Sequence, residues 1–101
     1  MRGIRVDILV FPGCLASAVA GAKDVLGAAN LLGAEAPKGE RVGFDLRVLS
    51  RDGAPARASN GMRIDADASI RSRRAAQVVF VPGFGYAGVR AVPAIVSALE
   101  R

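Results

Sequence analysis

Two short apolar runs of the same design dominate the hydrophobic pattern of the chain. Residues 8–11 (ILVF) and 78–81 (VVFV) contain no polar position, and a Pro-Gly pair follows each run at once. An apolar run without in-out alternation is typical of a strand that is covered on both faces. Parallel sheets with helices on both sides provide that cover, so the pattern predicts an α/β fold.

The segments around the first run carry the signals of a strand, a helix and a second strand. A strand is predicted over about residues 5–11, and a helix from Ser17, as its N-cap, to Leu32, with Gly33 as its C-cap. Alternation over residues 42–50 predicts a half-exposed strand near a sheet edge. The apolar stripe of the helix is expected to contain Val19, Val25, Leu26, Ala29 and Leu32.

Glycines and turn pairs organise the rest of the chain. Gly21 and Gly27 inside the helix predict a close approach of a strand or of another subunit. Asp52-Gly53 predicts a turn, and Asn60-Gly61 predicts a hairpin between two short arms. Residues 67–77 are expected to form a surface connection with at most a turn of helix. After Gly88, Pro93 at a first helical position starts a helix that continues to the last residues.

The order of these elements predicts the topology of the sheet. Long connections between apolar strands favour parallel neighbours, with the strand of residues 42–50 first, the N-terminal strand next, and residues 78–81 beyond it. A strand as apolar as residues 78–81 belongs inside a sheet, yet no later strand follows it. Either another chain pairs there, or residues 1–101 are the N-terminal portion of one larger domain. We therefore expect a flavodoxin-like parallel sheet with flanking helices, three-layer α/β/α and C-terminally incomplete.

Charge and cysteine content exclude several classes of protein. The net charge is +5, but the basic residues are scattered and the one cluster, residues 71–74, has no aromatic neighbour, which favours a solvated loop over a nucleic-acid site. A single cysteine and no histidine exclude an internal disulfide and His-containing zinc patterns. Asp7 and Pro12 argue against a secretion signal, and Lys23 and Asp24 against a membrane span. These features predict a cytoplasmic protein without membrane contact.

Five segments resemble one family in order and spacing. These are residues 6–13 (VDILVFPG), 20–30 (AGAKDVLGAAN), 48–53 (VLSRDG), 59–61 (SNG) and 79–83 (VFVPG). Together they resemble the ThiJ/PfpI superfamily, and in particular the glutamine-amidotransferase-like N-terminal domain of AraC-type transcriptional regulators. The resemblance covers nearly the whole chain, from about Ile4 to Arg101.

The resemblance also implies a reactive centre that this sequence lacks. Members of the superfamily carry a cysteine on a sharp strand-to-helix turn after the helix that begins near Pro93, and no residue here fills that position. Their N-terminal acidic partner to that cysteine aligns with Ala18, whose methyl group cannot hydrogen-bond a thiolate. Asp24 matches an acidic position of the family helix, and we interpret it as structural. The resemblance therefore predicts no catalytic residue in this chain.

The candidate binding residues follow the two apolar strands. Ligands of parallel α/β sheets bind beyond the carboxyl ends of the strands, which indicates Gly13, Cys14, Gly83, Phe84 and Gly85. The amides of the last three could form an anion cradle, or the glycines could simply turn the chain. Cys14 near a helix start could be reactive, or it could be a small buried residue. Cys14, Asp24 and Tyr86 do not make a triad, and no cofactor or metal motif is present.

Three hypotheses for the function remain open. The first is a non-catalytic ligand-sensing or dimerisation module of an AraC-type regulator, binding a small molecule and pairing as a homodimer through an exposed sheet edge or helix faces. DNA would be bound only by a domain beyond Arg101. The second is a fragment of a ThiJ/PfpI-like amidase or hydratase that lacks its catalytic cysteine. The third is a fragment that does not fold stably.

Overall fold

The computed structural model describes residues 2–72, 75–85, 90 and 92–100 of the chain. Strand β1 (Arg2–Leu9) is followed by helix α1 (Ala16–Gly33) and strand β2 (Val42–Ser50). The short strands β3 (Ala56–Arg57), β4 (Arg63–Ile64) and β5 (Ala68–Ser69) come next, and then the 3-10 turn η1 (Ile70–Ser72). Strand β6 (Val78–Phe80) and helix α2 (Val92–Leu99) complete the described elements.

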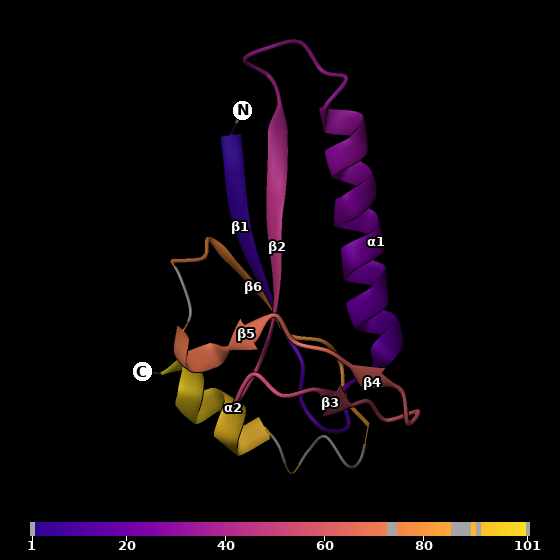
Figure 1. Ribbon diagram of the computed structural model, residues 1–101, viewed down its shortest axis with the longest axis vertical. Helices are drawn as coiled ribbons and strands as arrows, with labels where there is room; N and C mark the ends of the chain where they lie inside the picture. The colour runs from indigo at the N-terminus through magenta and orange to yellow at the C-terminus, as the bar shows by residue number, and fades with distance from the viewer. Residues whose placement is uncertain (1, 73–74, 86–89, 91, 101) are drawn as a thin grey trace.

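The main sheet has the order β5-β2-β1-β6, and all its pairs are parallel. The predicted neighbours β2, β1 and β6 are therefore confirmed, as are the α/β class and the helices beside a parallel sheet. Helix α1 runs along β2, whereas α2 lies beside η1 at the end of the sheet where the strands finish (Figure 1). The core centres on β1 and the residues just after it, where Ile8 and Val10 are completely buried.

The Asn-Gly hairpin is also confirmed. Strands β3 and β4 pair antiparallel, with Ala56 opposite Ile64, and Gly61 between them has a φ of 89°. Gly53 in the predicted Asp-Gly turn has a φ of 83°. Glycine reaches this left-handed region without the steric cost of a side chain. The local turn chemistry thus fixes both reversals of the chain between β2 and β5.

Other boundaries differ from the sequence prediction. Strand β1 spans residues 2–9 rather than 5–11. It starts earlier because Arg2 already pairs with Val42, and the Val10 amide still donates to the Leu49 carbonyl (2.8 Å) before the chain turns at Phe11. Pro93 is the second residue of α2, not the first. Residues 67–77 contain the strand β5 as well as η1, whose Ile70 is buried. The sequence Ala68-Ser69 is too short and too small to carry a strand signal of its own.

The caps of α1 were predicted incorrectly, and its apolar stripe was predicted correctly only in part. The N-cap is Leu15, in an extended conformation without a side-chain hydrogen bond, and the C-cap is Ala34. Val19 is buried and Leu26 packs against the core, but Val25 and Leu32 are 68% and 70% exposed. The helix is apolar around most of its circumference, so its periodicity does not define one buried face.

The close approach of α1 to the sheet occurs at Gly33. A Cβ atom on Gly33 would lie 2.8 Å from the carbonyl oxygen of Val42, whereas Gly21 and Gly27 have open space around them. The prediction that Gly21 and Gly27 admit a neighbouring strand is therefore wrong within this chain. Gly33 instead lets the chain leave α1 directly beneath the start of β2.

Substituting two glycines of α1 by alanine should have opposite effects on stability. We expect Gly33→Ala to lower the free energy of unfolding by about 1–3 kcal/mol, because the methyl group would clash with backbone. Gly21→Ala should raise it by about 0.5–1 kcal/mol, because alanine has the better helix propensity and meets no neighbour. Urea denaturation followed by circular dichroism measures both. Equal effects from the two variants would contradict this packing.

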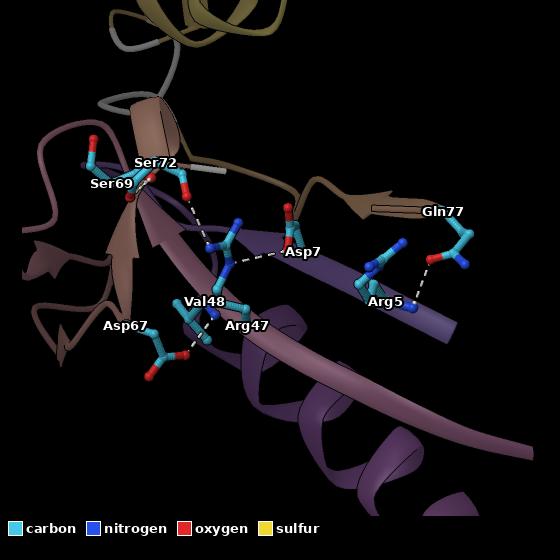
Figure 2. Close-up of polar contacts among 8 residues, drawn as sticks. All are labelled: Arg5, Asp7, Arg47, Val48, Asp67, Ser69, Ser72 and Gln77. Carbon is cyan, nitrogen blue, oxygen red and sulfur yellow. Dashed lines mark hydrogen bonds and ion pairs between the residues drawn. The ribbon is translucent and has the colours of Figure 1, made fainter. Parts of the chain in front are cut away.

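The outer edge of β2 is closed by side chains. Asn30 on α1 donates from Nδ2 to the carbonyl oxygen of Phe44 (2.9 Å) and accepts the Phe44 amide at Oδ1 (2.6 Å). Asp67 holds Val48 in the same way, accepting its amide at Oδ2 (2.8 Å) while its own amide donates to the Val48 carbonyl (2.7 Å; Figure 2). Both residues replace the backbone groups of a neighbouring strand, so this edge offers less for another chain to pair with.

Asn30→Ala should therefore lower the free energy of unfolding by about 1–3 kcal/mol, since two backbone groups of Phe44 lose their partners. Asn30→Asp should be no better, because it keeps the acceptor but loses the donor to the Phe44 carbonyl. Thermal unfolding compares them with Leu31→Ala as the control. Leu31 is 77% exposed on the same helix, and its truncation should change stability by less than about 0.5 kcal/mol. A control as damaging as Asn30→Ala would rule out the side-chain closure.

Candidate functional site

The structure brings the five predicted binding residues together. The loops after β1 and after β6 form a short antiparallel bridge between Cys14 and Phe84. The amide of Leu15 donates to the carbonyl of Gly83 (2.8 Å), and the amide of Gly85 donates to the carbonyl of Gly13 (3.0 Å). The bridge lies between the carboxyl ends of β1 and β6, where the chain order reverses, which is the expected position for a site in an open α/β sheet.

The backbone bonds limit what this site can offer an anion. The predicted cradle used the amides of Gly83, Phe84 and Gly85, but the Gly85 amide is already bound to the Gly13 carbonyl. At most two of the three amides are therefore left to face a ligand. A Cβ atom on Gly83 would lie 3.1 Å from Cδ1 of Leu15, so these glycines serve close packing as well as turning the chain.

Cys14, one of the two residues of this bridge, is fully buried. Its residue is 0% exposed, its amide donates to the Phe11 carbonyl (3.1 Å), and its carbonyl accepts the amide of Ser59 (2.8 Å). Nucleophilic and redox cysteines need access to their substrate, and a buried cysteine usually acts as a small apolar residue. In this arrangement, the thiol contributes packing rather than a reacting group.

The hairpin of β3 and β4 closes the site from one side. The amide of Gly13 donates to the carbonyl of Arg57 (2.9 Å), and a Cβ atom on Gly85 would meet Cβ of Ser59 at 3.3 Å. Arg57 and Ser59 thus belong to the site, although no sequence pattern singled them out. The Asn-Gly signal located the hairpin, but it says nothing of the long-range contacts that the hairpin makes.

The accessible surface of the site is apolar. The ring of Phe84 is 42% exposed and meets buried Phe11 edge-on, with the centroids 6.0 Å apart. Leu15 is 38% exposed beside Gly83. Such a surface suits an apolar group or a packing partner better than a charged transition state. Among the described residues, no three histidine, cysteine, aspartate or glutamate side chains gather as metal ligands.

The other polar residues of interest lie apart from the bridge. Asp24 is exposed on α1, consistent with its interpretation as a structural residue. Ala18 lies in the first turns of α1, and its methyl group brings no polar atom there. Tyr86 and Gly88 lie outside the described residues, as do two arginines of the cluster at residues 71–74, whereas Arg71 is exposed.

A separate pocket of about 610 Å³ opens on the other side of β1. It lies between the carboxyl ends of β1 and β2, the start of the hairpin and α2, and none of the five predicted residues lines it. Phe11 and Arg57 connect the two places, because Phe11 contacts Phe84 and the Arg57 carbonyl binds the Gly13 amide. Sequence reasoning missed this pocket, since its walls come from three stretches that are far apart in the sequence.

Comparison with known proteins confirms the fold. A structure of a candidate transcriptional regulator from Vibrio parahaemolyticus matches 98% of this chain with a TM-score of 0.71 and 16% identity. A ThiJ/PfpI family protein from Pseudomonas syringae matches 92% with a TM-score of 0.70 and 18% identity. An AraC family transcriptional regulator from Pseudomonas putida matches 93% with a TM-score of 0.65 and 22% identity.

The sequence comparisons are sparser. No family model matches the chain. An uncharacterized protein from the cpoL 5′ region of Streptomyces lividans is 34% identical over 79 residues, which are 78% of this chain. The chain spans about half the length of that relative, and 50%, 34% and 59% of the three similar structures. None of the helices in the described part of the chain has the length and apolar character that crossing a bilayer requires.

Proposed function

We propose that this chain, which has the fold of ThiJ/PfpI proteins, is a non-catalytic module of an AraC-type transcriptional regulator. On this proposal residues 1–101 form the N-terminal portion of one ThiJ/PfpI-like domain, and DNA is bound by a separate domain of the regulator. Two of the three similar structures are regulators, and each matches more than nine tenths of this chain. The module acts in the cytoplasm, without a cofactor.

The enclosure of Cys14 is the observation that carries the non-catalytic part of the proposal. Cys14 is the single thiol of the sequence, it is 0% exposed, and the sequence contains no histidine to act as its base. At the position where the family's acidic partner is expected, Ala18 offers no carboxylate. An apolar surface at the strand ends remains, and it supports binding rather than group transfer.

The proposed module has two tasks, sensing and association. A small ligand is bound near the bridge of Gly13, Cys14, Gly83, Phe84 and Gly85, where Phe84 and Leu15 supply exposed apolar surface. A homodimer forms through the exposed edge of β6 or through the outer face of α1. Both surfaces carry half-exposed or largely exposed aliphatic side chains.

The regulator proposal is tested on the natural protein in its own cell. Chromatin immunoprecipitation of the tagged protein should enrich discrete promoter regions, and deletion of the gene should change the transcripts from those promoters. A uniform distribution over the chromosome, with no change in transcripts, would contradict the regulator role.

The second candidate is a fragment of a ThiJ/PfpI-like amidase or hydratase, which the similarity to the Pseudomonas syringae protein favours. It is tested by ammonia release from glutamine and simple amides. We expect no turnover by this chain. Turnover that disappears in Cys14→Ser would establish an enzyme and overturn the non-catalytic proposal.

A further inference from the structure

The pocket beside β1 combines an apolar interior with a strongly positive rim. Val10, Phe11, Ala56 and Ile95 are at most 5% exposed and form its floor, and its volume of about 610 Å³ lies within the usual range for small-molecule sites. Arg51, Arg57 and Arg90, all exposed, line the same pocket.

A smaller hollow of about 390 Å³ continues the positive rim. Arg51 and Asp52 line both hollows, and Arg71 and Ser69 complete the smaller one. Four arginines and a single aspartate thus line the two openings. Oδ1 of that aspartate already accepts the amide of Ala54 (3.0 Å) within its own turn, so part of its carboxylate is engaged by the backbone.

Hydrogen bonds from side chains to backbone carbonyls hold the walls of the pocket in place. Ser50 Oγ donates to the Ala54 carbonyl (2.7 Å), Ser69 Oγ donates to the Arg51 carbonyl (2.8 Å), and Arg57 Nη1 donates to the Gly61 carbonyl (2.8 Å). The loop from Arg51 to Ala54 is therefore tied to both neighbouring segments. Guanidinium groups present planar donors that match a carboxylate or a phosphate, and the apolar floor needs a ligand with a hydrocarbon body.

We propose that this pocket binds a small organic anion, a carboxylate on an apolar body, with the body on the floor and the charge among the arginines at the rim. The inference deepens the proposed sensing role and rests on it for its regulatory meaning. It places the ligand next to the predicted residues rather than on them. Binding would reach the Cys14–Phe84 bridge through Phe11 and Arg57.

The test uses three probes on the purified protein, namely 4-phenylbutyrate, its neutral amide 4-phenylbutanamide, and inorganic phosphate. Calorimetric titration should show saturable binding of the carboxylate, with the amide and phosphate each weaker by about tenfold or more, since each lacks one half of the recognition. Nuclear magnetic resonance should place the shifted amides in residues 50–57. Equal binding of acid and amide, or no saturable binding of the acid, would overturn the proposal.

Variants of single arginines test which of these side chains bind the carboxylate. Arg51→Gln and Arg90→Gln should each weaken carboxylate binding by about fivefold to tenfold. Arg63→Gln should leave it unchanged, because Arg63 is an exposed arginine that pairs with Asp65 (3.3 Å) and lines neither hollow. If all three variants lose the same affinity for the carboxylate, the effect comes from the net charge of the protein alone, which would contradict a specific site. Binding without any transcriptional response in the cell would contradict the regulator role alone and leave the pocket established.

Discussion

Replacing Val79 by lysine is expected to weaken self-association of the isolated chain by at least about tenfold, as measured by sedimentation velocity over a concentration series. Strand β6 is the outer strand of the described sheet, and Val78, Val79 and Val81 are 46%, 46% and 48% exposed. An apolar edge strand of this kind is a ready template for pairing with another chain, and a lysine there is the usual means of preventing it.

The asymmetry between the two edges of the sheet strengthens this expectation. Asn30 and Asp67 occupy backbone groups on the outer side of β2, and the short strand β5 covers its last residues. Beyond β6 the described residues provide no strand. One edge is thus closed by this chain itself, and the other is available to a second copy or to a further strand of a longer polypeptide.

The matched control places the same lysine on α1. Val25 is 68% exposed, so Val25→Lys changes the charge equally without touching β6. If Val25→Lys dissociates the chain and Val79→Lys does not, the helix face is the contact surface and the edge hypothesis fails. A wild-type chain that remains a folded monomer at every concentration would also contradict it. An unfolded circular dichroism spectrum would instead support the third hypothesis, a fragment that is not stable alone.

Asp7→Ala is expected to lower the free energy of unfolding by about 3–5 kcal/mol, because it leaves the charge of Arg47 without its acidic partner. The two residues are opposite each other on β1 and β2, and Arg47 Nε lies 3.5 Å from Asp7 Oδ1. The Asp7 side chain is 3% exposed and the Arg47 side chain 18%, and both point away from α1. On that face Arg47 Nη1 also donates to the Ser72 carbonyl (3.1 Å; Figure 2). A loss of this size would consume much of the stability of a domain of this length.

The double variant Asp7→Leu, Arg47→Met provides the decisive comparison. Within the described residues, Nη2 of Arg47 is buried without a hydrogen-bond partner, so the pair is an imperfect one. Replacing both charges by apolar side chains should restore stability to within about 1 kcal/mol of the wild type or better. Urea denaturation of the two single variants and the double variant measures the coupling. If the losses of unfolding free energy add, so that the double variant is the least stable, then the destabilisation of the single variants does not come from breaking the ion pair.

The order of the parallel strands and the hairpin could be read from the sequence because local and global signals agree there. Uninterrupted apolar runs identify β1 and β6, and Asn60-Gly61 fixes the reversal between β3 and β4 through glycine's access to positive φ. The prediction of an uncovered apolar edge at β6 agrees with the exposure of its valines.

The surroundings of α1 could not be predicted in the same way. Its sequence is apolar on nearly every side, so Val25 and Leu32 were expected in the core, and only the packing of β2 against Asn30 and Gly33 determines which face is buried. The residues around the Cys14–Phe84 bridge were likewise predicted only in part. The rule about strand ends brought Gly13 and Gly83 together correctly, but the role of Arg57 depends on contacts distant in sequence.

Because Cys14 is buried, the rate at which its thiol, the one thiol of the sequence, is chemically modified measures local opening of the structure. The bridge to Phe84 and the hydrogen bond from the Ser59 amide hold two other segments against this buried residue, so an alkylating reagent reaches the thiol only when these contacts open. The rate of modification then reports how often the strand ends separate, without any label being introduced. A ligand in the pocket that holds Phe11 in place should lower this rate of modification. The cysteine would then report ligand binding at a site that it does not contact.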